Sequence, residues 1–134
     1  MKIEIAMIAS DVVIVDSAGW VEYLGDGPKA AGFARYLDKP EFVLLPTTVV
    51  YEVYKKLLRE RSSEVAQHFL SSAFGFQERL ISLDVVIAEL AAKISIETKL
   101  PMADAIIYAS ARQHRVPLIT SDAHFDGLPW VTMI

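Results

Sequence analysis

The sequence predicts an α/β fold, a three-layer α/β/α sandwich around a mostly parallel sheet of about five strands. Short apolar runs alternate along the chain with longer segments whose apolar residues recur at helical spacing. The runs at 12–15 and 42–45 are continuously apolar, as in strands buried on both faces of a parallel sheet. At 134 residues, with no internal repeat or linker, the chain is expected to form a single domain, 1–134.

The first half of the chain contains two strands and four helices. Residues 1–10 allow a short strand, because apolar and polar residues alternate, or an extension that precedes the domain. The strand at 12–15 ends at Asp16, and Ser17 is the expected N-cap of a helix that reaches Leu24. After a helix at 29–37 and the strand at 42–45, Thr47 is expected to cap a helix that runs to about 61. A further helix begins at 62–64 and ends before Gly75.

The second half continues the alternation. A strand is expected at 79–83, and Asp84 can cap a helix over 85–98. The segment 102–114 is apolar nearly all round, which predicts a buried helix. A strand at 118–120 and a loop follow, and 130–134 forms a last strand at the edge of the sheet.

Composition excludes several classes of protein. There are no cysteines, so disulfides and thiolate metal sites are excluded. No apolar run reaches the ~18 residues that span a bilayer, and the N-terminus does not resemble a signal peptide, so a cytoplasmic protein without a membrane partner is expected. The net charge of −4 argues mildly against binding nucleic acid through charge alone, although local basic faces matter more than the sum.

Four acids are expected to meet at one edge of the sheet. Asp16 and Asp122 follow buried strands, and Glu52 and Asp104 lie near the N-termini of helices. In a parallel sheet these positions fall at the carboxyl ends of the strands, where ligands bind. Each acid also has a structural interpretation: the two aspartates as turn formers or caps, Glu52 on a solvated face, and Asp104 as an acid of a first helical turn.

Asp104 is the most diagnostic of the four, because its helical neighbours are apolar. A carboxylate there is costly unless it is paired or bound to a metal. Four converging carboxylates repel one another and need cations, and oxygen ligands suit Mg²⁺ or Mn²⁺. The chemistry that follows is metal-assisted attack of water on a phosphodiester.

Four segments in order along the chain resemble the PIN-domain ribonucleases, in particular the VapC-type toxins of toxin–antitoxin pairs. They are Val-Ile-Val-Asp16-Ser17, Val-Val-Tyr-Glu52-Val, Leu-Pro-Met-Ala-Asp104-Ala and Leu-Ile-Thr-Ser-Asp122-Ala-His-Phe125. The resemblance implies a five-stranded parallel sheet and an endoribonuclease that binds one or two Mg²⁺ or Mn²⁺ ions through the four acids. It implies an RNA substrate, a cognate antitoxin and a homodimer. It also implies that Ser17 and Thr120 or Ser121 orient waters or a carboxylate, and that Asp126 is auxiliary.

Other side chains have weaker assignments. The basic residues Lys55, Lys56 and Arg59 are candidates for RNA contact, although a solvated helical face explains them equally well. His124 is interpreted as an exposed loop residue without a catalytic role, and Tyr51 as a core or interface residue rather than one that stacks on bases.

Three other functions compete with this hypothesis. One is a PIN fold kept only for protein contacts. Another is a HAD-like or receiver-like phosphotransfer domain, but Ala18 stands where a HAD strand carries its second Asp, and no strand-end Lys suits a receiver. A flap-type DNA nuclease would normally carry more acids on a longer chain.

Overall fold

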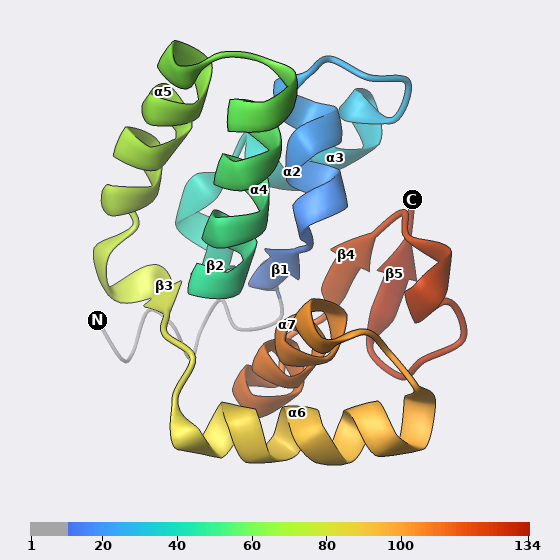
Figure 1. The fold of residues 1–134 in the computed structure, drawn as a ribbon. Helices are drawn as coiled ribbons and strands as arrows, with labels where there is room; N and C mark the ends of the chain where they lie inside the picture. The colour runs from blue at the N-terminus through green and yellow to red at the C-terminus, as the bar shows by residue number, and fades with distance from the viewer. Residues whose placement is uncertain (1–10) are drawn as a thin grey trace.

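A five-stranded parallel sheet runs through residues 11–134, the part of the chain that this computed structural model describes (Figure 1). The strand order is β3-β2-β1-β4-β5, and all four neighbouring pairs are parallel. The predicted fold class and the placement of the last strand at an edge are therefore confirmed. The interpretations of residues 1–10 lie outside the described residues. The strands are β1 (Val13–Val15), β2 (Val43–Pro46), β3 (Leu80–Ile81), β4 (Leu118–Thr120) and β5 (Val131–Met133).

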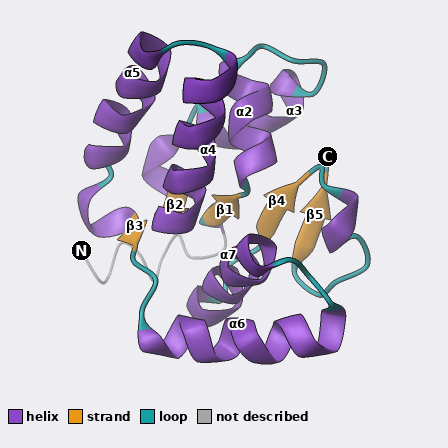
Figure 2. Ribbon diagram, in the orientation of Figure 1, coloured by secondary structure: helices purple, strands orange, loops and turns teal. Residues whose placement is uncertain are grey.

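Helices cover both faces of the sheet (Figure 2). The connections from β1 to β2 and from β2 to β3 move across the sheet in one direction, and the connection from β3 to β4 returns in the other. Since such crossovers are right-handed, the returning pair must lie on the opposite face, as Figure 1 shows. The first face carries α2 (Ser17–Leu24), α3 (Ala30–Leu37), α4 (Thr47–Glu60) and α5 (Ser63–Phe74); the second carries α6 (Val85–Thr98) and α7 (Met102–His114).

The core lies between these layers. Ile14 and Val15 of β1 and Val43 and Leu45 of β2 are fully buried, as the continuous apolar runs predict. Helix α7 buries a run of consecutive side chains, and α6 packs along it, so α7 is enclosed as expected. Within residues 11–134, no helix has the length and apolar character needed to cross a bilayer.

Two predicted helix caps are wrong by one residue. Asp16, not Ser17, caps α2: its backbone is extended and its side chain accepts a hydrogen bond from the Gly19 amide. Pro46 occupies the capping position of α4, where Thr47 is already helical, and no side chain caps that end. Helix α2 therefore begins two residues after the end of β1, and α4 begins at the residue after β2, which brings the first turns of both helices to the edge of the sheet.

Two predicted strands are shorter than expected. Residues 77–79 form a short 3₁₀ helix, so β3 keeps only two residues. The last strand begins at Val131 because Trp130 has a φ of 67°, a left-handed conformation that interrupts extended backbone.

Helix α2 approaches β1 and α3 very closely at Gly19. A Cβ placed there would lie 2.5 Å from Cε1 of Phe33 and 2.6 Å from Cγ1 of Val15. Both neighbours are fully buried, so neither can move aside freely. The absence of a side chain at Gly19 therefore sets the position of the helix that follows Asp16.

We predict that Gly19→Ala lowers the free energy of unfolding by about 1–3 kcal/mol, because it overpacks this contact. Gly27→Ala is the matched control: its Cβ would displace only the carboxylate at the far end of the flexible Glu22 side chain, whose hydrogen bond to the Lys29 amide is exposed, and a change of about 0.5 kcal/mol is expected. Urea denaturation measures both variants, and equal stabilities would contradict the packing argument.

Candidate metal centre

Asp16 stands at the centre of the site, directly after β1. Its backbone amide donates to the Ile119 carbonyl at 3.1 Å, which continues the pairing of β1 with β4. Its side chain is only 2% exposed. One carboxylate oxygen accepts from the Gly19 amide at 3.1 Å, and the other accepts from the Thr120 hydroxyl at 2.7 Å. The carboxylate is thus fixed in direction by a backbone amide of α2 and a side chain of β4.

The end of β4 connects this carboxylate to a second one. The backbone amide of Asp122 donates to the Thr120 hydroxyl oxygen at 2.9 Å, while that hydroxyl donates to Asp16. Thr120 is completely buried, so both hydrogen bonds are shielded from water. One threonine therefore sets the position of Asp16 relative to Asp122.

Glu52 reaches the same region from α4. The Ser17 hydroxyl donates to Glu52 Oε1 at 2.7 Å, which joins the first turn of α2 to the second turn of α4. Glu52 therefore accepts a hydrogen bond from another helix. A purely solvated Glu52 would instead pair with Lys55 or Lys56 on its own helix.

Asp104 lies in the first turn of α7, and its side chain is 16% exposed. His124 Nδ1 lies 3.1 Å from Oδ2 of Asp104 and 3.3 Å from Oδ1 of Asp122. These three side chains each present one ligand atom, and those atoms lie within 4.8 Å of one another.

His124 is exposed, as the sequence interpretation expects, but its contact with two of the acids was not foreseen. Asp122 caps a short 3₁₀ turn and accepts a hydrogen bond from the His124 amide at 2.9 Å. This turn directs the imidazole back toward α7. The spacing of two residues between Asp122 and His124 could have indicated that these two side chains lie close together. It could not have shown that the first turn of α7, which carries Asp104, packs against them.

Burial and mutual repulsion disfavour negative charge in this cluster. Burial raises the pKa of Asp16 to about 6, against the hydrogen bonds from Thr120 and Gly19, which lower it, and the charges of Asp122 and Asp104 add to the rise. Burial also raises the pKa of Asp104, followed by the charge of Asp122 and, more weakly, that of Glu52; the hydrogen bond to His124 opposes the rise. These shared effects mean that Asp16, Glu52, Asp104 and Asp122 lie close enough to interact.

The cluster fits a divalent cation. Within residues 11–134, no Lys or Arg forms an ion pair with any of the four acids, and the imidazole of His124 contacts Asp104 and Asp122. Carboxylate oxygens are the donors that Mg²⁺ and Mn²⁺ prefer. Among the described residues, Asp104, Asp122 and His124 bring their ligand atoms within reach of one ion, and Asp16 and Glu52 lie beside this group, close enough for their charges to interact with it.

Two of the auxiliary residues lie outside the hydrogen-bond network. Ser121 is half-buried and Asp126 is exposed, and neither side chain hydrogen-bonds to an acid of the cluster within the described chain. The resemblance implies that the hydroxyls of Ser17 and of Thr120 or Ser121 orient waters or a carboxylate. In the structure the hydroxyls of Ser17 and Thr120 contact carboxylates.

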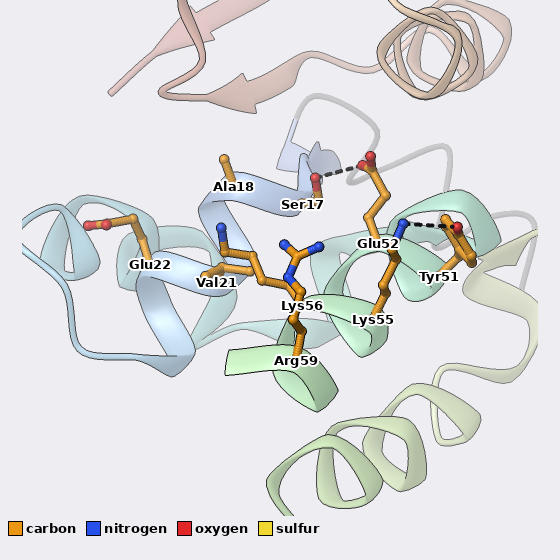
Figure 3. Close-up of a pocket in the computed structure, with 9 residues that line it drawn as sticks. All are labelled: Ser17, Ala18, Val21, Glu22, Tyr51, Glu52, Lys55, Lys56 and Arg59. Carbon is orange, nitrogen blue, oxygen red and sulfur yellow. Dashed lines mark hydrogen bonds between the residues drawn. The ribbon is translucent and has the colours of Figure 1, made fainter. Parts of the chain in front are cut away.

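A basic cleft opens beside Glu52, between α2 and α4 (Figure 3). Its volume is about 430 Å³. Lys55, Lys56 and Arg59 line it along α4, and Ser17 and Glu52 lie at the end nearest the acids. The three predicted RNA-contact residues thus face one cleft that leads to the candidate metal centre.

Comparison with known proteins agrees with this architecture. The family model of the PIN domain matches residues 13–131. A toxin–antitoxin complex from Klebsiella pneumoniae contains a chain that is 26% identical, with 90% of this chain and 96% of that chain covered and a TM-score of 0.70. No curated protein matches the sequence significantly.

Two more distant structures share the fold. DNA-bound VapBC from Salmonella typhimurium matches at 14% identity over 92% of this chain and 96% of that chain, with a TM-score of 0.69. The sarcin-ricin loop cleaving toxin VapC20 from Mycobacterium tuberculosis matches at 18% identity over 89% and 96%, with a TM-score of 0.70. The chain belongs to the PIN domain family.

The raised pKa of Asp16 predicts how the metal-free protein responds to pH. Between about pH 4 and pH 6 the native state binds more protons than the unfolded state, so the free energy of unfolding falls as pH rises through this window. Asp16→Asn removes the titrating group and keeps a hydrogen-bond acceptor for Gly19. At pH 7.5 in EDTA the variant should be more stable than the wild type by about 3 kcal/mol.

Urea denaturation at a series of pH values measures this difference. The two proteins should converge near pH 4, where the aspartate is neutral in the native state. Parallel curves over the whole range would contradict the assignment of the titration to Asp16.

Proposed function

We propose that this protein is a metal-dependent endoribonuclease, the toxin of a type II toxin–antitoxin pair. The observation that carries the proposal is the meeting of Asp16, Glu52, Asp104 and Asp122 at the carboxyl edge of the sheet with no Lys or Arg partner in the described chain. Membership of the PIN family and the likeness to a toxin–antitoxin complex support it. HAD-like and receiver-like phosphotransfer domains belong to other families, so the match to the PIN domain argues against these two alternatives.

Each acid has a proposed role. Asp16, Asp104 and Asp122 would hold Mg²⁺ or Mn²⁺, and Glu52 would hold the same ion or a second one, or position the attacking water. A metal bound there would lower the pKa of that water and offset the charge that builds up on the phosphodiester.

The hydroxyls and the imidazole position these acids. Thr120 orients Asp16, and Ser17 orients Glu52, in each case through a hydrogen bond of 2.7 Å. His124 contacts both Asp104 and Asp122, and so keeps the two carboxylates close enough to bind the same metal ion. We assign no role to Ser121 or Asp126 beyond the auxiliary one that the resemblance implies.

We propose that an antitoxin segment covers a second, apolar groove on the protein. This groove of about 700 Å³ lies among α2, α4 and α5, and its floor includes Trp20, Leu57 and Phe69. The neighbours that are toxin–antitoxin complexes support such a partner.

We also propose a homodimer, which the resemblance implies. The exposed apolar side chains of α6 and α7 provide a surface that a second copy could cover; they include Val85, Val86, Ile96 and Met102.

Asp104→Asn is predicted to abolish Mg²⁺-dependent cleavage of RNA, because it removes a ligand charge without removing volume. Glu89→Gln is the matched control: it neutralises an exposed acid of α6 that pairs only with Lys93, and it should leave the rate unchanged. Incubation of total RNA with each protein in Mg²⁺ and in EDTA, followed by gel analysis, measures the effect. Full activity in Asp104→Asn would contradict the site.

The same variants separate the enzyme from a PIN fold that only binds proteins. Calorimetric titration should detect Mn²⁺ binding to the wild type and to Glu89→Gln, and not to Asp104→Asn. A binding module would take up no Mn²⁺ in any of the three.

A further inference from the structure

Tyr51 is an aromatic residue that core packing does not explain. It precedes Glu52 on α4, but the buried residues of that helix are Val49, Val53 and Leu57. The side chain of Tyr51 is 61% exposed, although the sequence pattern assigns it to the core or to an interface. It lines the basic cleft together with Ser17 and Glu52, so its ring lies beside the candidate metal centre.

Lys55 holds this ring in place. Its ammonium group lies 5.6 Å from the centre of the Tyr51 ring, and its Nζ lies 3.5 Å from the tyrosine hydroxyl (Figure 3). Within the described chain Lys55 has no acidic partner, whereas Lys56 and Arg59 both contact Glu60 at 3.4 Å. Lys55 therefore keeps a charge that is available to an anion immediately next to an exposed aromatic face.

An aromatic residue and two basic residues follow one another along one wall of the cleft. Tyr51, Lys55 and Arg59 follow one another at intervals of four residues, so they lie in one row on the surface of α4. This row spans about 12 Å along α4, from Tyr51, next to Glu52, to Arg59. The Glu22 carboxylate on the opposite wall is turned toward the Lys29 amide, to which it bonds at 2.7 Å.

An aromatic face followed by cations in a row is the arrangement that binds a single nucleic-acid strand. Bases stack on the exposed ring and phosphates pair with the cations, but a base can stack on a protein side chain only if it has left its duplex. We propose that Tyr51 stacks on an unpaired base of the RNA next to the scissile phosphate, while Lys55 pairs with the adjoining phosphate. The proposal rests on the proposed function, and it makes the substrate strand single-stranded at the point of cleavage.

Binding of RNA in EDTA tests this inference apart from cleavage. The probes are a fluorescein-labelled single-stranded RNA of twelve nucleotides and the same strand in a duplex, measured by fluorescence anisotropy. Tyr51→Ala should weaken binding of the single strand about tenfold, and Tyr51→Phe should retain wild-type affinity within about twofold, because the ring and not the hydroxyl makes the contact. Phe74→Ala removes another exposed aromatic ring, on α5, and should change nothing.

Salt dependence separates stacking from charge. Lys55→Ala should reduce the slope of log Kd against log salt by about one, and Tyr51→Ala should leave that slope unchanged. A strand that carries 2-aminopurine should lose fluorescence on binding to the wild type and to Tyr51→Phe, and should keep it with Tyr51→Ala. Circular dichroism checks that each variant is folded.

Several results would overturn the inference. They are equal affinity of wild type and Tyr51→Ala for the single strand, equal weakening of Tyr51→Phe and Tyr51→Ala, or an equal loss of duplex binding in Tyr51→Ala. If RNA is cleaved with Mg²⁺ but Tyr51→Ala keeps the wild-type KM, the inference fails and the proposed function stands. If binding depends on Tyr51 but no cleavage occurs with Mg²⁺ or Mn²⁺, the proposed function fails together with the placement of the base at a scissile phosphate, and only the contact of Tyr51 with an unpaired base stands.

Discussion

The structure depends on a conflict between burial and charge at Asp16. Its carboxylate is almost completely buried at the end of the central strand, and burial opposes its ionisation. Two hydrogen bonds, from the Gly19 amide and the Thr120 hydroxyl, favour the ionised form and fix its direction, but they do not overcome the cost. The residual cost is what makes this edge of the sheet receptive to a cation. A fully compensated carboxylate would gain little from binding one.

The same residues serve both the fold and the site. Asp16 is at once the cap of α2 and the centre of the acidic cluster, and Thr120 is at once the last residue of β4 and the link between two carboxylates. Gly19 allows α2 to pack closely enough on β1 for the cap to form. Because these contacts are shared, small changes of packing beneath the site alter the geometry above it. The site is therefore held by the sheet and not by flexible loops.

Much of this arrangement could be predicted from the sequence, because it follows from periodicity. Continuous apolar runs and helical spacing predict the parallel sheet, and the rule for strand ends places acids such as Asp122 at one edge. The exchange of capping roles between Asp16 and Ser17 depends on a backbone angle that no pattern records. The contact of His124 with two acids depends on how close α7 comes to a turn twenty residues away in sequence, and the exposure of Tyr51 depends on which side of α4 the other helices cover.

The order of the strands has a consequence for how the protein is made. The central strand pairs with β2 early in the chain, but its other neighbour, β4, is synthesised last but one, and Asp16 and Thr120 are 104 residues apart. A chain still emerging from the ribosome can assemble the contact of Ser17 with Glu52 before it contains Thr120 or Asp122. The half-made domain lacks half of its acids. Under the proposed function, a nascent chain is therefore harmless to the RNA around it, and cleavage can begin only after translation of nearly the whole domain.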